Sequence, residues 1–177
     1  MKLYLFAAFV SISYVANSQG VYMDPDSISF SDFRGKVIRY RNHLAETHCG
    51  MVVSIDTTNG VANYRVYPTF FKDSSWIDFK DVPEEKWMDL FLHEQLNYCI
   101  AILVAKELKS YFLEHPPETF DEWRKACNEY AFRDYVMGFK YEHDTYWGDD
   151  KEKQSEWRAL VNRQLDSLKN ISLDLPK

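Results

Sequence analysis

The sequence predicts an α+β fold that is predominantly α, with about four helices around a long central helix and a small antiparallel sheet. From about residue 83 to 115 the spacing of apolar residues is helical, and the stretch from Tyr98 to Ala105 holds no charged residue. A helix that is apolar on every side must be covered by the rest of the chain. From about residue 51 to 80, β-branched and aromatic residues flank Asn59-Gly60, a dipeptide that favours a hairpin turn.

The first 18 residues resemble a secretory signal peptide. Lys2 precedes an uncharged run from Leu3 to about Ala16, and Ala16-Asn17-Ser18 has the small-x-small form that signal peptidase cleaves. A retained membrane anchor is the alternative, but the run is shorter than the roughly 20 residues that a span requires. We therefore expect residues 19–177 to form one secreted, extracellular domain without a transmembrane segment.

Composition supports a folded domain and excludes one class of partner. Aromatic residues make up 16% of the chain, and Gly and Pro number only six each, which argues against disorder. The formal net charge is −6, so general attraction to nucleic acid is not expected.

The first elements after the signal peptide are expected to be a helix and a sheet. Ser29 and Asp32 resemble a capping box, and the apolar stripe that follows predicts a helix from Ser29 to about Glu46. The hairpin strands are expected at 51–56 and 61–67, and 75–80 alternates well enough to be a third strand.

Proline and capping residues delimit the later helices. Pro83 suits the first turn of the central helix, and Pro116-Pro117 prevents its continuation beyond His115. Thr119 and Glu122 form a second capping box, which predicts a helix from Phe120 to about Gly138. Residues 140–150 are the most irregular segment, and a last helix is expected at about 150–170.

Three cysteines, Cys49, Cys99 and Cys127, are the disulfide candidates. If the helices after Pro83 and Pro117 pack antiparallel, Cys99 and Cys127 are out of register for a direct bridge. We therefore favour a bridge from Cys49 to one of the other two, with a bridge to a second chain or three free thiols as alternatives. Asn170-Ile171-Ser172 is an N-glycosylation sequon, so Asn170 is the candidate glycosylation site.

Motifs for catalysis are weak in this sequence. His93-Glu94-Gln95-Leu96-Asn97 starts like a zinc-protease helix, but Asn97 stands where the second histidine must be, so we expect no metal and interpret His93 as an exposed helix residue. No phosphate loop, dinucleotide fingerprint or nucleophile elbow occurs. No cofactor and no catalytic residue is therefore assigned.

The aromatic excess supports the leading functional hypothesis, a non-catalytic binding protein that acts through a protein surface or a small hydrophobic pocket. Its partner would be an unidentified protein or a small apolar ligand. The alternatives are that the rings only fill the core, that the protein is a secreted hydrolase using His143 with Glu142 or Asp144, or that it is a disulfide-linked structural dimer. The candidate ligand-binding residues are Tyr64, Tyr67, Trp76, Tyr141, His143 and Trp147.

Overall fold

The computed structural model describes residues 20–38, 44–58 and 61–174, and it has the expected α+β class. The predicted signal peptide lies outside these residues. The α-helices are α1 (Glu84–Glu114), α2 (Phe120–Asp144) and α3 (Lys151–Ser167), the strands are β1 (Ala45–Glu46), β2 (Cys49–Thr58), β3 (Val61–Phe70) and β4 (Trp76–Ile77), and the short 3-10 helices are η1 (Pro25–Ser27) and η2 (Phe30–Asp32). Three α-helices are thus present in the described residues, fewer than the four expected.

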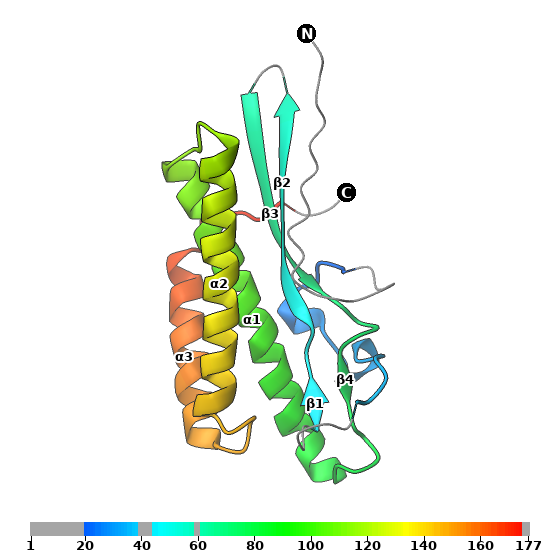
Figure 1. Ribbon diagram of the computed structural model, residues 1–177. Coiled ribbons are helices and arrows are strands. Elements are labelled where there is room, and N and C mark those ends of the chain that lie inside the picture. The colour runs from blue at the N-terminus through cyan, green and yellow to red at the C-terminus, as the bar shows by residue number, and fades with distance from the viewer. Residues whose placement is uncertain (1–19, 39–43, 59–60, 175–177) are drawn as a thin grey trace.

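The helices form an antiparallel set, and the long β2–β3 ribbon runs beside it (Figure 1). Local sequence explains where each helix begins. Pro83 precedes α1, the Thr119 hydroxyl accepts a hydrogen bond from the Glu122 amide at 3.2 Å, and the Asp150 carboxylate accepts one from the Lys153 amide at 2.9 Å. The helix starts and the end of α1 before Pro116 follow the sequence prediction closely.

Helix α1 is the centre of the core. Every residue from Tyr98 to Ala105 is buried, and Leu103 and Leu108 are fully covered. Strands β2 and β3 cover one side through residues such as Val66, and α2 covers another through Trp123. Helix α3 adds Val161 near the middle of α1. None of the described helices combines the length and apolar character needed to cross a membrane.

The strands form two small sheets rather than one. β2 and β3 pair antiparallel from Cys49 opposite Phe70 to Thr58 opposite Val61. The segment expected to be a third strand, β4, pairs instead with β1, placing Ala45 opposite Ile77. The turn predicted at residues 59–60 lies outside the described residues.

The helix expected from Ser29 to Glu46 is wrong. Asp32 does accept a hydrogen bond from the Ser29 amide at 2.8 Å, but in the described parts of this stretch, 29–38 and 44–46, only the single turn η2 is helical; residues 39–43 lie outside the described residues. The Gly35 amide then donates to the Ser75 carbonyl oxygen at 2.8 Å, so this segment lies against residues 72–75. A Cβ at Gly35 would approach the Ser74 carbonyl to 2.7 Å, and this close approach requires glycine.

Helix α2 is longer than expected. It continues through Gly138 and ends at Asp144, inside the segment predicted to be irregular. A glycine in a helix interior costs only about 1 kcal/mol relative to alanine, which favourable packing elsewhere can offset. The extra turns bring Tyr141 and Glu142 to face α1.

Candidate functional site

A cleft of about 600 Å³ opens between the N-terminal half of α1, the C-terminal half of α2 and the β1–β2 segment. Its lining comes from residues within 44–49, 90–100 and 134–142, and from the turn at 146–149 that connects α2 to α3. Segments far apart in the sequence therefore build one site. In Figure 1 this region is the end of the helical layer near β1.

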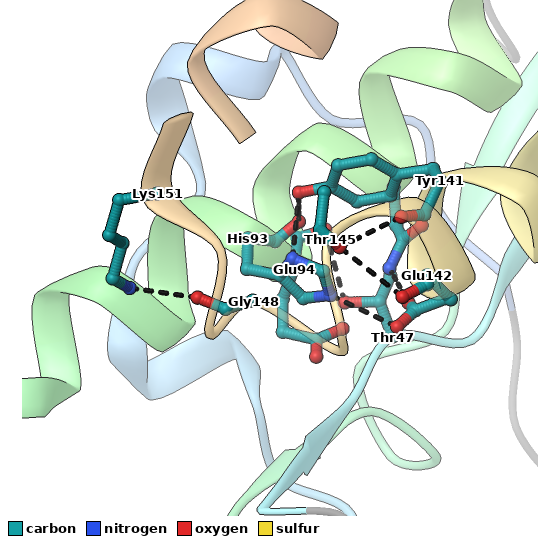
Figure 2. A network of polar contacts seen from close by, with 9 residues as sticks. Thr47, His93, Glu94, Tyr141, Glu142, Thr145, Gly148 and Lys151 are labelled. Atoms are coloured by element: carbon teal, nitrogen blue, oxygen red, sulfur yellow. Dashed lines mark hydrogen bonds and ion pairs between the residues drawn. The ribbon is translucent and has the colours of Figure 1, made fainter. Parts of the chain in front are cut away.

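His93 lies at the base of the cleft and is held on both sides of its ring. It is only 1% exposed, so the expectation that it is an exposed helix residue is wrong. Its Nε2 lies 3.0 Å from Glu142 Oε2, and its Nδ1 lies 2.8 Å from the Tyr141 hydroxyl, whose ring stacks on the imidazole (Figure 2). The Tyr141 hydroxyl also donates to the His93 carbonyl oxygen at 3.2 Å.

These contacts favour the protonated form of His93. Burial by itself would lower its pKa, but the hydrogen bond to Glu142 and the charge of Glu94 outweigh burial and raise the pKa above the usual value. An imidazolium donates from both nitrogens, which matches an acceptor at Glu142 and an acceptor at the Tyr141 oxygen. Asn97 Nδ2 donates to the other Glu142 oxygen, so both oxygens of that carboxylate are hydrogen-bonded.

Glu94 is a buried carboxyl group beside this network. It is 4% exposed, and its Oε2 atom has no hydrogen-bond partner. Thr47 donates to the backbone carbonyl of Glu94 at 3.3 Å, which joins the β1–β2 segment to α1. Burial raises the pKa of Glu94 to about 7; the charge of His93 opposes the shift and that of Glu142 adds to it.

Asp134 brings a second carboxyl group to the cleft from α2. It makes no hydrogen bond or ion pair with any part of the chain that the structure describes, and burial raises its pKa to about 6. The Cys49 thiol also lines the cleft and donates to the Asn97 carbonyl at 3.8 Å. Burial, followed by the charges of Asp134 and Glu94, raises the pKa of Cys49 well above its usual value, so the thiol stays protonated and is a poor nucleophile.

The turn between α2 and α3 covers His93. Tyr146, Trp147 and Gly148 have successive φ angles of 48°, 55° and 90°, a backbone conformation that residues other than glycine rarely adopt. A Cβ at Gly148 would lie 3.0 Å from His93 Cγ, so glycine is required for this contact. Lys151 Nζ donates to the Gly148 carbonyl at 2.9 Å and holds the turn in place (Figure 2).

This turn completes the mouth of the cleft with aromatic side chains. Tyr146 is 64% exposed and Trp147 is 48% exposed. Tyr135 and Phe139, one helical turn apart on α2, are also exposed, and their rings stack with centroids 6.3 Å apart. The mouth therefore presents apolar faces to solvent, above a floor of polar groups.

The residues predicted to bind a ligand do not all meet at this cleft. Of these candidates, only Trp147 is part of the lining. Tyr141 lies behind the cleft and supports His93. Trp76 is 1% exposed in the core, and Tyr64 donates to the Pro117 carbonyl at 2.7 Å near the far end of α1. Tyr67 lies half-buried on β3, and His143 lines a separate depression beside α3.

The groups of the predicted hydrolase point to different partners. Glu142 contacts His93, whereas Asp144 accepts hydrogen bonds from Lys140 at 2.8 Å and from the Trp157 indole at 3.1 Å. His143 is exposed, with its ring beside those of Phe139 and Trp147. These contacts give His143 no carboxylate partner, and a catalytic role for His143 stays a prediction.

Cys49, Cys99 and Cys127 are free thiols in this structure, and a disulfide from Cys49 stays a prediction. Asn170, the predicted glycosylation site, is exposed just beyond α3. Among the described residues, no group of three or more His, Cys, Asp or Glu side chains is placed to hold a metal ion.

Sequence reasoning missed Glu94 and Asp134, although one signal was available for Glu94. On a helical wheel Glu94 shares a face with Phe91, Tyr98 and Ala101, all of which are buried. A carboxylate on an apolar stripe is either compensated or functional, because burying a charge is costly. Asp134 gives no such signal, since exposed aromatic residues surround it on α2.

Comparison with known proteins found no matching family model, no similar curated protein and no similar solved structure. The function is therefore argued from the geometry and chemistry of the cleft.

Proposed function

We propose that this chain is a secreted, non-catalytic binding protein that holds a small ligand in the cleft between α1, α2 and the β1–β2 segment. The observation that carries the proposal is a cleft of about 600 Å³ whose mouth exposes the rings of Tyr135, Phe139, Tyr146 and Trp147. Binding sites for small molecules typically have about this volume, with aromatic walls and a few placed polar groups.

The floor of the cleft favours binding over covalent catalysis. Both nitrogens of His93 have partners in Tyr141 and Glu142, so the ring is a positioned structural group. The Cys49 thiol, whose pKa burial raises, is protonated at neutral pH. A preformed polar floor suits recognition, because little has to be ordered when a ligand enters.

Gly138 offers a direct test, because it lines the cleft and a Cβ there would meet nothing within 4 Å. In Gly138→Trp the new indole should fill part of the cleft while α2 stays intact. The matched control is Gly138→Ala, which adds only a methyl group.

The readout is native mass spectrometry of the protein secreted from eukaryotic cells. We expect a small molecule to accompany the unaltered protein and Gly138→Ala, and to be lost from Gly138→Trp. A ligand retained by Gly138→Trp would place binding elsewhere. If nothing co-purifies, NMR screening of fragments should shift the Gly138 amide signal, and a library without any such fragment would contradict the proposal.

Secretion is tested in the same experiment by the intact mass of the product. Cleavage after Ser18 predicts a chain of residues 19–177, with one added glycan if Asn170 is modified. A product that retains residue 1 inside the cells would contradict the extracellular location.

A second candidate function, from a different class, is a hydrolase in which Glu94 acts as a general acid. The pKa of Glu94, raised to about 7 by burial, is close to the value that acid–base catalysis at neutral pH requires. This candidate predicts turnover of some ester or glycoside that Glu94→Gln abolishes and His143→Ala leaves unchanged. Loss of activity in His143→Ala alone would instead support the hydrolase predicted from the sequence.

A further inference from the structure

Carboxyl groups outnumber cationic groups in the described lining of the cleft, where Glu46, Glu94, Asp134, Glu142 and Asp149 face a single basic side chain, His93. We infer that the ligand is an organic cation, with its ammonium group bound between Glu94 and Asp134 and its apolar part against the aromatic mouth. This inference rests on the proposed function and names the chemical class of the ligand.

The strongest observation is the unpartnered Oε2 atom of Glu94. The residue is 4% exposed and lines the cleft, yet this oxygen accepts no hydrogen bond. A buried carboxylate oxygen without a donor is destabilising, so a donor that entered through the cleft would stabilise it. An ammonium group supplies both the donor and the compensating charge.

Asp134 supplies a second acceptor in the lining of the same cleft. Asp134, Glu94 and Glu142 all belong to the lining of this cleft, together with Cys49. Glu142 already accepts hydrogen bonds from Asn97 and His93. Asp134 has no partner within the described ranges, so it remains available to a ligand.

The charge balance of the lining points the same way. No Lys or Arg side chain occurs among the described residues that line the cleft, and His93 is engaged with Glu142. Glu46 pairs with His48 at 3.2 Å. Lys151, just behind the turn, bonds to the Gly148 carbonyl and to Asp89. An anionic ligand would therefore meet repulsion here, whereas a cation would be attracted.

The mouth suits the rest of such a ligand. The exposed rings of Tyr135 and Phe139 stack on one wall, and Tyr146 and Trp147 lie on the turn opposite the β1–β2 segment. Aromatic faces attract cations and also cover apolar groups. A molecule with an ammonium group on a short apolar or aromatic body would match both the polar floor and the aromatic mouth of the cleft.

The pH dependence of ligand affinity provides a second readout. The ammonium group favours the ionised carboxylates, so affinity should rise with pH as Glu94 and Asp134, with pKa values of about 7 and about 6, lose their protons. A protonated amine with a pKa of about 10 keeps its charge over this range. The other titratable or charged groups around these two are Glu46, Cys49, His93, Glu142, Asp149 and Lys151.

The test uses probes of equal size that differ in charge. Tryptamine is cationic, tryptophol is its neutral analogue, and indole-3-acetate is anionic. Calorimetric titration should show tryptamine binding at least about tenfold more tightly than either analogue, with an affinity that increases from pH 5.5 to pH 8.

Variants locate the ammonium group. Glu94→Gln and Asp134→Asn should each weaken tryptamine about tenfold to hundredfold and leave tryptophol unchanged, because only the charged hydrogen bond is lost. Glu129→Gln, an exposed change on α2, is the matched control and should alter neither probe. Circular dichroism of each variant checks that the fold is retained.

The outcomes separate this inference from the proposed function. If tryptophol or indole-3-acetate binds as tightly as tryptamine and Gly138→Trp blocks that binding, the cleft binds ligands but the cation inference fails. If tryptamine does not bind at millimolar concentration, or binds equally well to Glu94→Gln and Asp134→Asn, the inference also fails. The ligand that co-purifies with the protein then tests the proposed function independently.

Discussion

The two halves of α1 are buried in different ways. From Tyr98 to Phe112 the buried side chains of the helix are all apolar and pack against β2, β3 and α2, and Leu103 is fully buried. Nearer its start the helix buries His93 and Glu94 instead, and these face the cleft. One helix thus provides the core at one end and a polar floor at the other.

The difference shows where stability comes from and where it is lost. Burying an apolar side chain such as Leu103 stabilises the fold by about 1.5 to 3 kcal/mol. Burying the carboxylate of Glu94 opposes folding unless the group takes up a proton or a partner. The apolar half therefore supports a site that would not be stable by itself.

Truncation in the apolar half should have the largest effect. Leu103→Ala removes fully buried atoms and leaves a cavity, so we expect a loss of about 3 kcal/mol or more in the free energy of unfolding. Leu113→Ala, at a position 64% exposed on the same helix, should cost less than about 1 kcal/mol. Urea denaturation measures both, and equal effects would contradict the central position of α1.

Neutralising Glu94 in the polar half should increase the free energy of unfolding, the opposite of the change expected for Leu103→Ala. Its pKa rises from 4.5 to about 7 on folding, so its protonation supports the fold fully below about pH 4.5, and this support is lost as pH rises to about 7. Glu94→Gln should therefore stabilise the protein by about 3 kcal/mol at pH 8 and by little at pH 4. Unfolding measured at both values tests this, and a loss of stability at pH 8 would show that the carboxylate is already compensated.

The turn over His93 should tolerate no side chain at Gly148. Its φ of 90° and the 3.0 Å approach to His93 Cγ both oppose a Cβ, so Gly148→Ala should destabilise the fold by about 1 to 3 kcal/mol. The change should also move the imidazole away from Glu142, whose hydrogen bond raises the pKa of His93, and so lower that pKa, which NMR titration measures. An unchanged imidazole titration would mean that the turn does not position the ring.

The smallest effect is expected at Gly138. Its place within α2 and the open space around it predict that Gly138→Ala stabilises the protein by about 0.5 to 1 kcal/mol. Thermal unfolding measures the gain. A destabilised Gly138→Ala would indicate that the cleft wall is closer to Gly138 than the structure places it.

Much of the architecture could be predicted because its signals are local. Pro83 and Pro116 delimit α1, Thr119 begins α2, and the β-branched runs around residues 59–60 form the paired strands β2 and β3. Each depends on the conformational preference of a few adjacent residues. The failed helix after Ser29 had an equally good start, but hydrogen bonds of Arg34 and Gly35 with residues 72–75 replaced it.

The candidate site was much less predictable. The sequence showed His93, Glu94 and Asn97 on a helix, but the pattern alone suggested an exposed face for His93. Burial of that face depends on Tyr141 and Glu142, which lie 48 and 49 residues from His93 along the chain. It also depends on a turn with positive φ angles at residues 146–148, for which Gly148 is the only signal in the sequence of that turn.

By itself the sequence determined the α+β class, the ends of the helices and the uncharged centre of α1, because short-range sterics, capping and apolar spacing decide these features. Only the tertiary structure decided that the start of α1 faces a cleft, that Glu94 and Asp134 both line it, and that the Oε2 atom of Glu94 has no hydrogen-bond donor among the described residues. The physical reason is that burial and electrostatic environment arise from segments distant in sequence, and local preference does not encode them.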